Sequence, residues 1–351
     1  MRILFFTSGD CSDPASRYRG YFFANELRKY GFFTLVYPSK SSKKKLRIRR
    51  AFDYSMDLLK KVKLILTSEI DDVFYIQRSI RGSVPSILTS LFIVISKCLL
   101  KRKIIYDFDD ALFLSEPWAT KISVKFCDTV IVGSHFLKEY AEKYNQRTFL
   151  LPTSVYTNEQ EIVKKRNKKE NVVIGWIGLP INLRYLRLLI EPLNFLGKKY
   201  NIEFRIVGAR SYGDYERYSP LFSKFSGVKL KLIPWSLETE WKELSEFDIG
   251  VMPLFNIDFE RGKCGFKIIQ YMVLGIPPVA SNVGENKYII KEGINGFLCD
   301  EENEWIEKLS LLIESEELRI RIGINGRKTV EEKYSLEKNG RVLANIITSL
   351  L

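Results

Sequence analysis

The chain has 351 residues, of which 46% are hydrophobic and 13% aromatic. This composition excludes an intrinsically disordered protein, because disordered chains are poor in apolar and aromatic residues. The length suffices for two domains of ordinary size, each with its own hydrophobic core. The net charge of +13 points to a negatively charged partner, such as nucleic acid, an anionic membrane surface or phosphorylated substrates.

The positive charges gather in four runs, at residues 43–50, 60–63, 101–103 and 164–169. A solvated surface is the alternative explanation for any one run. The sequence has no helix-turn-helix, zinc-finger or RNA-recognition signature, so we expect no nucleic acid partner and favour the periphery of an anionic membrane. The apolar stretch 84–100 contains Pro85 and Lys97 and is barely long enough to cross a bilayer. It predicts a buried or interfacial helix rather than a membrane span.

The five cysteines are widely spaced and form no C-x-x-C pair: Cys11, Cys98, Cys127, Cys264 and Cys299. This spacing argues against a zinc site and against a disulfide framework, and it fits a reducing cytoplasm. The N-terminal residues run directly into an apolar strand, without the charged start, apolar run and cleavage site of a signal peptide. We therefore expect a cytoplasmic protein that is peripheral at the inner face of the cell membrane.

Along the first half of the chain, short apolar runs alternate with longer amphipathic ones, which is the pattern of a doubly wound α/β sheet. Strands are predicted at residues 2–7, 33–37, 72–77, 103–107, 129–132 and 148–151. Helices are predicted at residues 18–30, 52–67, 84–100 and 135–144. The residues 157–171 lack apolar periodicity and are heavily charged, which predicts a linker.

The alternation begins again after the linker. Strands are predicted at residues 172–177, 203–207, 228–233, 249–253 and 278–281. Helices are predicted at residues 183–200, 237–246, 266–274, 302–314, 316–334 and 336–351. The sequence therefore predicts an α/β protein with one Rossmann-like domain at 1–156 and a second at 172–335, followed by the helix 336–351.

Lysine and glycine residues surround the start of the predicted helix 266–274. The unpaired N–H groups and the dipole at a helix N-terminus favour an anion, and Lys263 and Lys267 add positive charge at the same place. Two ordinary surface lysines are the alternative. The pattern favours a binding site for a diphosphate group, with Lys267 as its main contact.

Residues 259–298 read FERGKCGFKIIQYMVLGIPPVASNVGENKYIIKEGINGFL. This stretch resembles the donor-binding segment of retaining GT-B glycosyltransferases, a large family that includes bacterial mannosyl- and glucosyltransferases of cell-surface polysaccharides. In that family a glutamate that contacts the donor sugar stands eight residues before a second one that contacts the ribose. These positions fall at Gly262 and Gln270. Gln270 can still hydrogen-bond a ribose, whereas Gly262 has no side chain, so the sugar contact is expected from Glu260 or from the backbone.

The same resemblance implies two Rossmann-like domains that face a cleft, with the last helix crossing back to the first domain. It also implies a diphosphate contact at Arg184 and a nucleotide-base contact at Trp235, for which a surface arginine and a core tryptophan are the alternatives. Arg17 and Arg19 follow the first strand, at the edge where ligands bind in such sheets. They are expected to hold the donor phosphate or an anionic acceptor.

Three aspartates crowd one strand end, in the sequence IIYDFDDALFL at 104–114. Their like charges repel unless a cation, an arginine or a proton offsets them. Asp107 and Asp109 match the metal-binding D-x-D of GT-A glycosyltransferases, but GT-B members generally need no metal, so neither a metal nor another cofactor is expected. Related enzymes often carry a histidine here. We expect Asp110, or else Asp109, to take its place and stabilise the anomeric carbon or orient the acceptor hydroxyl; capping of a helix is the alternative.

His135 is the only histidine, and Ser134 is predicted to cap the helix that it begins, so a structural role is expected for His135. The resulting hypothesis is a glycosyltransferase of the hexosyltransferase type. It would move a sugar from a nucleotide-diphosphate donor to a glycan or lipid-linked glycan acceptor in the synthesis of surface polysaccharide. The alternatives are a GT-B-like polyol-phosphate transferase that uses a cytidine nucleotide, and a degenerate partner subunit without turnover.

Overall fold

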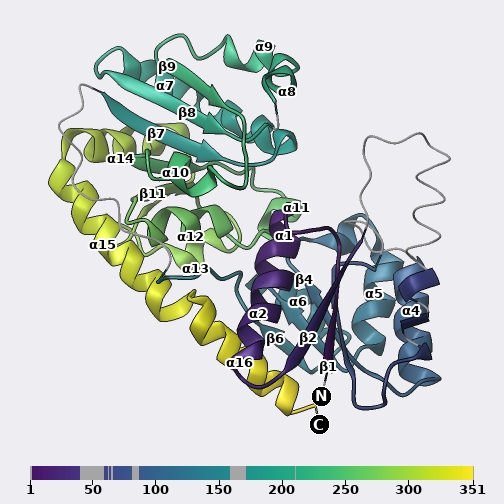
Figure 1. Ribbon diagram of the computed structural model, residues 1–351. Helices are drawn as coiled ribbons and strands as arrows, with labels where there is room; N and C mark the ends of the chain where they lie inside the picture. The colour runs from purple at the N-terminus through teal and green to yellow at the C-terminus, as the bar shows by residue number, and fades with distance from the viewer. Residues whose placement is uncertain are drawn as a thin grey trace. The chain divides into compact units, whose positions relative to one another are not determined.

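The computed structural model describes residues 2–39, 59–61, 63, 64, 66–80, 87–158, 171–209 and 211–350. Most of the predicted helix 52–67 and of the predicted linker 157–171 lies outside these residues. The chain divides into two compact units, each built on one sheet (Figure 1). Unit 1 comprises Met1–Ser154, Arg261–Cys264 and Leu336–Leu351, and unit 2 comprises Val155–Glu260 and Gly265–Ser335.

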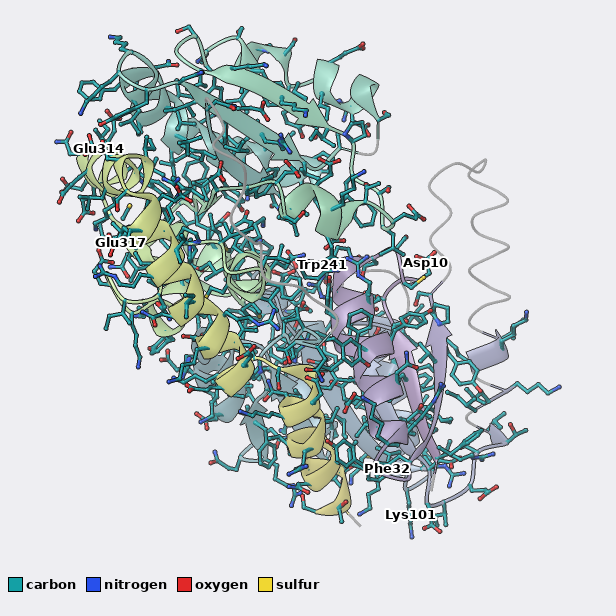
Figure 2. All side chains as sticks on the ribbon, turned by 60° about the vertical axis from the view of Figure 1, so that its left-hand side comes forward. Asp10, Phe32, Lys101, Trp241, Glu314 and Glu317 are labelled. Atoms are coloured by element: carbon teal, nitrogen blue, oxygen red, sulfur yellow. The ribbon has the colours of Figure 1, made fainter. Side chains whose placement is uncertain are left out.

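The sheet of unit 1 has six parallel strands in the order β2-β1-β3-β4-β5-β6. Their bounds are Arg2–Thr7 (β1), Phe33–Pro38 (β2), Val73–Gln77 (β3), Lys103–Phe108 (β4), Thr129–Val132 (β5) and Thr148–Leu150 (β6). All residues of β3 and β5 are buried, as expected for parallel strands, which read as nearly continuous apolar runs. Figure 2 labels Asp10 at the edge where β1 ends, and Phe32 and Lys101 at the opposite edge, before β2 and β4.

The helices of unit 1 differ from the prediction at two places. In place of one helix at 18–30 the structure has a π-helical turn η1 followed by α2, and the short helix α1 precedes them. The helix α5 was not expected. The buried residues of α5 are Ala119, Thr120, Ser123 and Val124, which are too small or too polar to give a strong apolar periodicity. The bounds are Pro14–Ser16 (α1), Arg17–Tyr21 (η1), Phe22–Arg28 (α2), Ile87–Cys98 (α4), Leu112–Leu114 (η2), Pro117–Phe126 (α5), His135–Glu142 (α6) and Leu336–Thr348 (α16).

Two of these helices come from opposite ends of the chain. The last one, α16, packs on α2, and the hydroxyl of Tyr30 donates a hydrogen bond to the carbonyl of Glu337 (3.0 Å). The predicted apolar helix 84–100 corresponds to α4, whose exposed side includes Leu91 and Ile95. Among the residues that the structure describes, no helix combines the length and the apolar character needed to span a bilayer.

The sheet of unit 2 also has six parallel strands, in the order β12-β11-β10-β7-β8-β9. Their bounds are Val172–Ile177 (β7), Ile202–Val207 (β8), Lys229–Ile233 (β9), Ile249–Met252 (β10), Pro278–Ser281 (β11) and Phe297–Cys299 (β12). The core of unit 2 is one cluster of buried apolar side chains from both the strands and the helices, including Trp176, Leu193 and Trp305.

One predicted helix of unit 2 is interrupted. In place of a helix at 183–200 the structure has a long 3-10 helix η3, Pro180–Leu189, followed by α7, Ile190–Gly197. Pro192 has no N–H group to bond the carbonyl of Leu188, which prevents a continuous α-helix here. The remaining bounds are Tyr212–Glu216 (α8), Ser219–Phe222 (α9), Glu240–Leu244 (α10), Asp258–Arg261 (α11), Phe266–Val273 (α12), Asn286–Ile289 (α13), Glu302–Glu314 (α14) and Glu316–Lys333 (α15).

Candidate functional site

The acidic end of β4 lies beside an arginine that the sequence prediction did not identify. Arg78, the first residue after β3, donates from Nε to Asp109 Oδ1 (2.5 Å) and from Nη2 to Asp110 Oδ2 (2.6 Å). The three side chains are 14%, 12% and 22% exposed. Burial alone would raise the pKa of Asp109, but the charge and the hydrogen bond of Arg78 outweigh it and lower that pKa. Arginine is therefore the group that offsets the crowded carboxylates.

The backbone at Arg78 is unusual as well. Its φ of 60° lies in the left-handed region, which is unfavourable for residues other than glycine. The peptide is fixed on both sides, because the N–H of Arg78 donates to the carbonyl of Asp107 (2.7 Å) and the Tyr106 hydroxyl donates to the carbonyl of Arg78 (3.0 Å). This conformation directs the chain so that one side chain reaches both carboxylates.

A second ion pair is fully buried at the same strand end. Arg19 Nη2 lies 2.6 Å from Asp107 Oδ1, and neither side chain is exposed. The Tyr75 hydroxyl donates to Asp107 Oδ2 (2.8 Å) and Arg19 Nη1 donates to the carbonyl of Leu151 (3.0 Å). Burial alone would lower the pKa of Arg19, but the charge of Asp107 raises it. The prediction that Arg19 binds a phosphate is therefore wrong, and both oxygens of Asp107 are already occupied.

The segment Arg261–Cys264 belongs to unit 1 and packs on this strand end. Ser134 Oγ donates to the carbonyl of Gly262 (3.2 Å), Cys264 Sγ donates to the carbonyl of Asp109 (3.1 Å), and Lys263 Nζ lies 4.0 Å from Asp110 Oδ1. A Cβ at Gly262 would lie 2.7 Å from the Cβ of Ala111. Close packing thus explains glycine here, because a glutamate would displace the segment.

The predicted anion-binding residues of unit 2 gather at the start of α12. Gly265, the residue before the helix, has a φ of 65°, and a Cβ there would lie 2.2 Å from Ile289 Cδ1. Lys267 is half-buried, and its Nζ lies 5.7 Å from the centre of the Trp176 ring. A Cβ on Gly178, which follows β7, would lie 3.0 Å from Lys267 Cε. The lysine thus extends over the carboxyl end of β7, the edge where ligands bind in such sheets.

The structure brings Arg184 and Glu260 together. Arg184 Nη2 donates to Glu260 Oε1 (2.9 Å), and the Tyr185 hydroxyl donates to the same oxygen. The Glu260 side chain is fully buried, whereas that of Arg184 is 46% exposed. Burial, followed by the hydrogen bond to Glu260, raises the pKa of Tyr185 to about 12. A cation thus remains accessible at Arg184, while the carboxylate predicted to contact the sugar is held by two neighbours.

The residues predicted to bind ribose and base are joined by a carboxylate. Glu240 Oε1 accepts a hydrogen bond from Gln270 Nε2 (2.6 Å), and Glu240 Oε2 accepts one from the Trp235 indole N–H (3.1 Å). Glu240 and Gln270 are 3% and 4% exposed, and Trp235 is half-buried. The sequence prediction missed Glu240, because nothing in its neighbourhood along the chain connects residue 240 with 270.

Two further predicted residues lie in unit 1. Arg17 is buried in η1, with its guanidinium 4.7 Å from the centre of the Tyr18 ring and 3.5 Å from the carbonyl of Cys11. Ser134 Oγ accepts a hydrogen bond from the N–H of Leu137 (3.4 Å), so the predicted helix cap before His135 is confirmed. Neither Asp109 nor Asp110 caps a helix, because η2 follows Ala111 without a side-chain cap.

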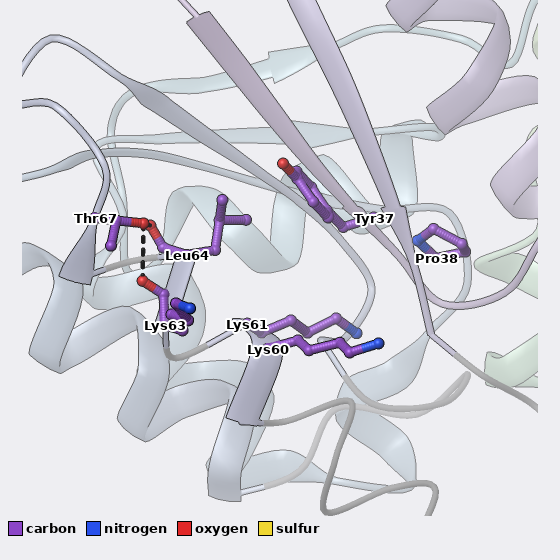
Figure 3. Close-up of a pocket in the computed structure, with 7 residues that line it drawn as sticks. All are labelled: Tyr37, Pro38, Lys60, Lys61, Lys63, Leu64 and Thr67. Atoms are coloured by element: carbon purple, nitrogen blue, oxygen red, sulfur yellow. Dashed lines mark hydrogen bonds between the residues drawn. The ribbon is translucent and has the colours of Figure 1, made fainter.

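A separate pocket of about 450 Å³ lies where β2 ends (Figure 3). It is lined by Tyr37, Pro38, Lys60, Lys61, Lys63, Leu64 and Thr67. Figure 3 shows Lys60 and Lys61 extending side by side. Lys61 is 3% exposed and its Nζ donates to Ser39 Oγ (3.0 Å) and to the carbonyl of Ile80 (2.5 Å). The positive run 60–63 is therefore not simply a solvated surface.

Comparison with protein families gives a match over part of the chain. Residues 171–315 match the family model described as "Glycosyl transferases group 1". The capsular polysaccharide biosynthesis glycosyltransferase CapM of Staphylococcus aureus is 26% identical over 172 residues. That alignment covers 47% of this chain and 43% of CapM, so it spans less than half the length of the relative.

Solved structures resemble the chain over nearly its whole length. Sucrose-phosphate synthase from Thermosynechococcus elongatus has a TM-score of 0.76 at 12% identity, covering 99% of this chain and 98% of its own. Anabaena HepE in complex with UDP has a TM-score of 0.71 at 15% identity, covering 99% and 100%. The lipopolysaccharide outer core galactosyltransferase WaaB has a TM-score of 0.66 at 14% identity, covering all of both chains. With the two parallel six-stranded sheets, these likenesses confirm the predicted GT-B fold.

Proposed function

We propose that this protein is a glycosyltransferase that moves a sugar from a nucleotide-diphosphate donor to a glycan or lipid-linked glycan acceptor, with retention at the anomeric carbon, in the synthesis of surface polysaccharide. The observation that carries the proposal is the position of Lys267. It stands in the first turn of α12, behind a glycine-rich loop and over the end of β7, within the segment 171–315 that matches the glycosyltransferase family model.

The donor would bind to unit 2 through its diphosphate. The helix dipole is positive at the start of α12, so an anion is favoured there. Lys267 and the exposed guanidinium of Arg184 would neutralise the charge that develops on the leaving diphosphate as the glycosidic bond breaks. Lys263 and Arg17, both in unit 1, are proposed as further diphosphate contacts.

Asp110 and Asp109 are proposed as the catalytic carboxylates. The lowered pKa of Asp109 keeps it ionised at neutral pH, so it cannot serve as a general acid. Ionised carboxylates at this strand end would instead stabilise positive charge on the anomeric carbon or orient the acceptor hydroxyl. Asp110 is the better candidate, because its side chain is the more exposed of the two. Glu260 and the backbone of Gly262 remain proposed contacts of the sugar.

A thermal-shift screen against UDP, GDP and CDP tests donor binding. One nucleotide at about 100 times its Kd should stabilise the protein by about 2.7 kcal/mol, a Tm shift of about 5 °C or more. Lys267→Ala should abolish the shift. Lys287→Ala is the matched control, because Lys287 is an exposed lysine of unit 2 that also lies over an aromatic ring, 5.2 Å from the centre of Tyr288. Equal shifts in both variants would contradict the proposal.

Turnover distinguishes an enzyme from a degenerate partner subunit. The subunit is the second candidate, because Gly262 and Gln270 stand in place of two glutamates. Release of UDP, GDP or CDP from nucleotide sugars should be measured with and without membrane extract as the source of acceptor. Nucleotide binding without release under any condition would favour the subunit. Transfer of a polyol phosphate from a cytidine nucleotide would favour the polyol-phosphate transferase. We place the activity in the cytoplasm, at the periphery of an anionic membrane.

A further inference from the structure

The side chain of Gln270 is held in one orientation by Glu240. A carboxylate oxygen accepts hydrogen bonds and cannot donate them. At 2.6 Å from Glu240 Oε1, the amide of Gln270 must therefore present its nitrogen, because two acceptor oxygens at this distance would repel. The nitrogen is committed to Glu240, and Gln270 Oε1 accepts no hydrogen bond from the part of the chain that the structure describes.

We infer that Glu240 is a positioning residue that fixes the Gln270 amide with Oε1 facing the ribose, so that the hydroxyl groups of a ribonucleotide are recognised by an oxygen acceptor. This inference rests on the proposed function. It explains how glutamine can stand where the resembling enzymes have glutamate: with its nitrogen engaged, the outward face of the amide is an acceptor, as a carboxylate would be.

Two features of Glu240 suit it to this role. Its second oxygen accepts the Trp235 indole N–H (3.1 Å), so the same carboxylate positions the proposed base contact and the proposed ribose contact. Glu240 is also the first residue of α10, and its N–H donates to the carbonyl of Ser236 (3.1 Å). A negative charge at a helix N-terminus is favourable, and a charged acceptor polarises the amide and strengthens Oε1 as an acceptor.

A charge-swap cycle in the unliganded protein tests the pairing. Gln270→Glu should place two carboxylates in contact and lower the Tm at pH 8 by roughly 3–10 °C. Glu240→Gln should leave the Tm nearly unchanged, because an amide at 240 can still accept from Trp235 and donate to Gln270. The double variant Glu240→Gln/Gln270→Glu preserves every hydrogen bond of the network and should regain the wild-type Tm. The pairing would be overturned if Gln270→Glu had the same Tm as the wild type, or if the double variant had a Tm no higher than that of Gln270→Glu alone.

Binding of UDP and 2′-deoxy-UDP, or of the corresponding pair for whichever base binds, tests the ribose role. In Glu240→Gln the Gln270 amide should turn over, lowering affinity for the ribonucleotide roughly three- to tenfold and reducing its preference over the deoxynucleotide. The double variant should restore both. The control is Glu243→Gln on the same helix, whose carboxylate lies 3.9 Å from Arg205 Nη1 and which should bind as the wild type does.

The two experiments separate this inference from the proposed function. An intact ribonucleotide preference in Glu240→Gln, or equal affinity of the wild type for both nucleotides, would overturn the ribose role while leaving donor binding in place. A wild-type protein that binds no nucleoside diphosphate would refute the proposed function and the ribose role together, whereas the charge-swap cycle would still decide whether Glu240 orients Gln270.

Discussion

Removal of the Arg78 side chain should destabilise the protein, because it leaves two aspartates at the acidic end of β4 without their counter-charge. Deleting one partner of a buried ion pair costs about 3–5 kcal/mol, because the remaining charge stays buried without compensation. The side chains of Arg78, Asp109 and Asp110 retain 14%, 12% and 22% exposure. We therefore expect a loss near the lower limit, about 3 kcal/mol, for Arg78→Ala.

The left-handed backbone at Arg78 separates two contributions. At a φ of 60°, a residue with a Cβ loses about 1 kcal/mol relative to glycine. Arg78→Gly removes the ion pairs and also this strain, so it should be about 1 kcal/mol more stable than Arg78→Ala. Lys101→Gly is the matched control, since Lys101 is exposed and has a φ of 53°. That variant should be as stable as the wild type or slightly more stable, with unchanged activity.

The sign of the pH dependence of stability follows from the pKa of Asp109. The pKa of Asp109 is lowered in the folded protein, so its stabilisation is present above the unfolded value of about 3.9 and is lost only as pH falls through the lower folded pKa. Without Arg78, burial and the repulsion between Asp109 and Asp110 should raise the pKa of one carboxyl group above its unfolded value. The variants should then be least stable at high pH and should recover part of the loss as pH falls.

Urea unfolding at pH 8 and at pH 5 measures these differences. We expect the gap in unfolding free energy between wild type and Arg78→Gly to be smaller at pH 5. Turnover of any identified donor should decrease in both Arg78 variants and should depend on pH differently from the wild type. A loss below about 1 kcal/mol, or an identical loss at the two pH values, would refute the account of Arg78 as the counter-charge of both aspartates.

Two other predictions concern the same strand end. Gly262→Glu introduces the glutamate of the family that the chain resembles. It should lower the unfolding free energy by about 1–3 kcal/mol without raising turnover, because its Cβ would lie 2.7 Å from that of Ala111. Urea unfolding that shows no loss of stability would contradict the close packing. Asp110→Asn should reduce nucleotide release with little change in Tm, whereas Asp107→Asn should lower the unfolding free energy by about 3–5 kcal/mol by leaving buried Arg19 without its partner. If Asp110→Asn lowered the Tm while Asp107→Asn mainly lowered turnover, Asp107 would be the catalytic carboxylate and Asp110 the structural one.

The positions of most strands along the chain follow from sequence, because parallel strands buried on both faces read as short apolar runs between turn residues. The strands 2–7, 129–132, 172–177 and 278–281 were predicted with their exact bounds. The helices were harder to predict. Pro192 divides one of them into η3 and α7, and α5 buries small side chains that give little periodicity.

The candidate site was predictable only as far as neighbours along the chain determine it. The crowding of Asp107, Asp109 and Asp110 indicated that a counter-charge was needed, but Arg78 lies 31 positions before Asp109 and becomes its neighbour only through the pairing of β3 with β4. Glu240 and Gln270 are likewise 30 positions apart. Adjacent strands of a parallel sheet end at one edge. The position of Arg78 directly after a predicted strand was therefore the one sequence feature that could have identified it as the counter-charge.

The composition of unit 1 from three separate stretches has a consequence during synthesis. Residues 1–154 emerge from the ribosome long before Arg261–Cys264 and Leu336–Leu351, the other parts of the same unit. Helix α16 buries Leu343, Ile346 and Ile347, and until it emerges α2 lacks the surface on which it packs. Although domains generally fold in the order in which they leave the ribosome, here the N-terminal unit reaches its final packing last. A nascent chain halted after residue 154 should therefore remain sensitive to protease.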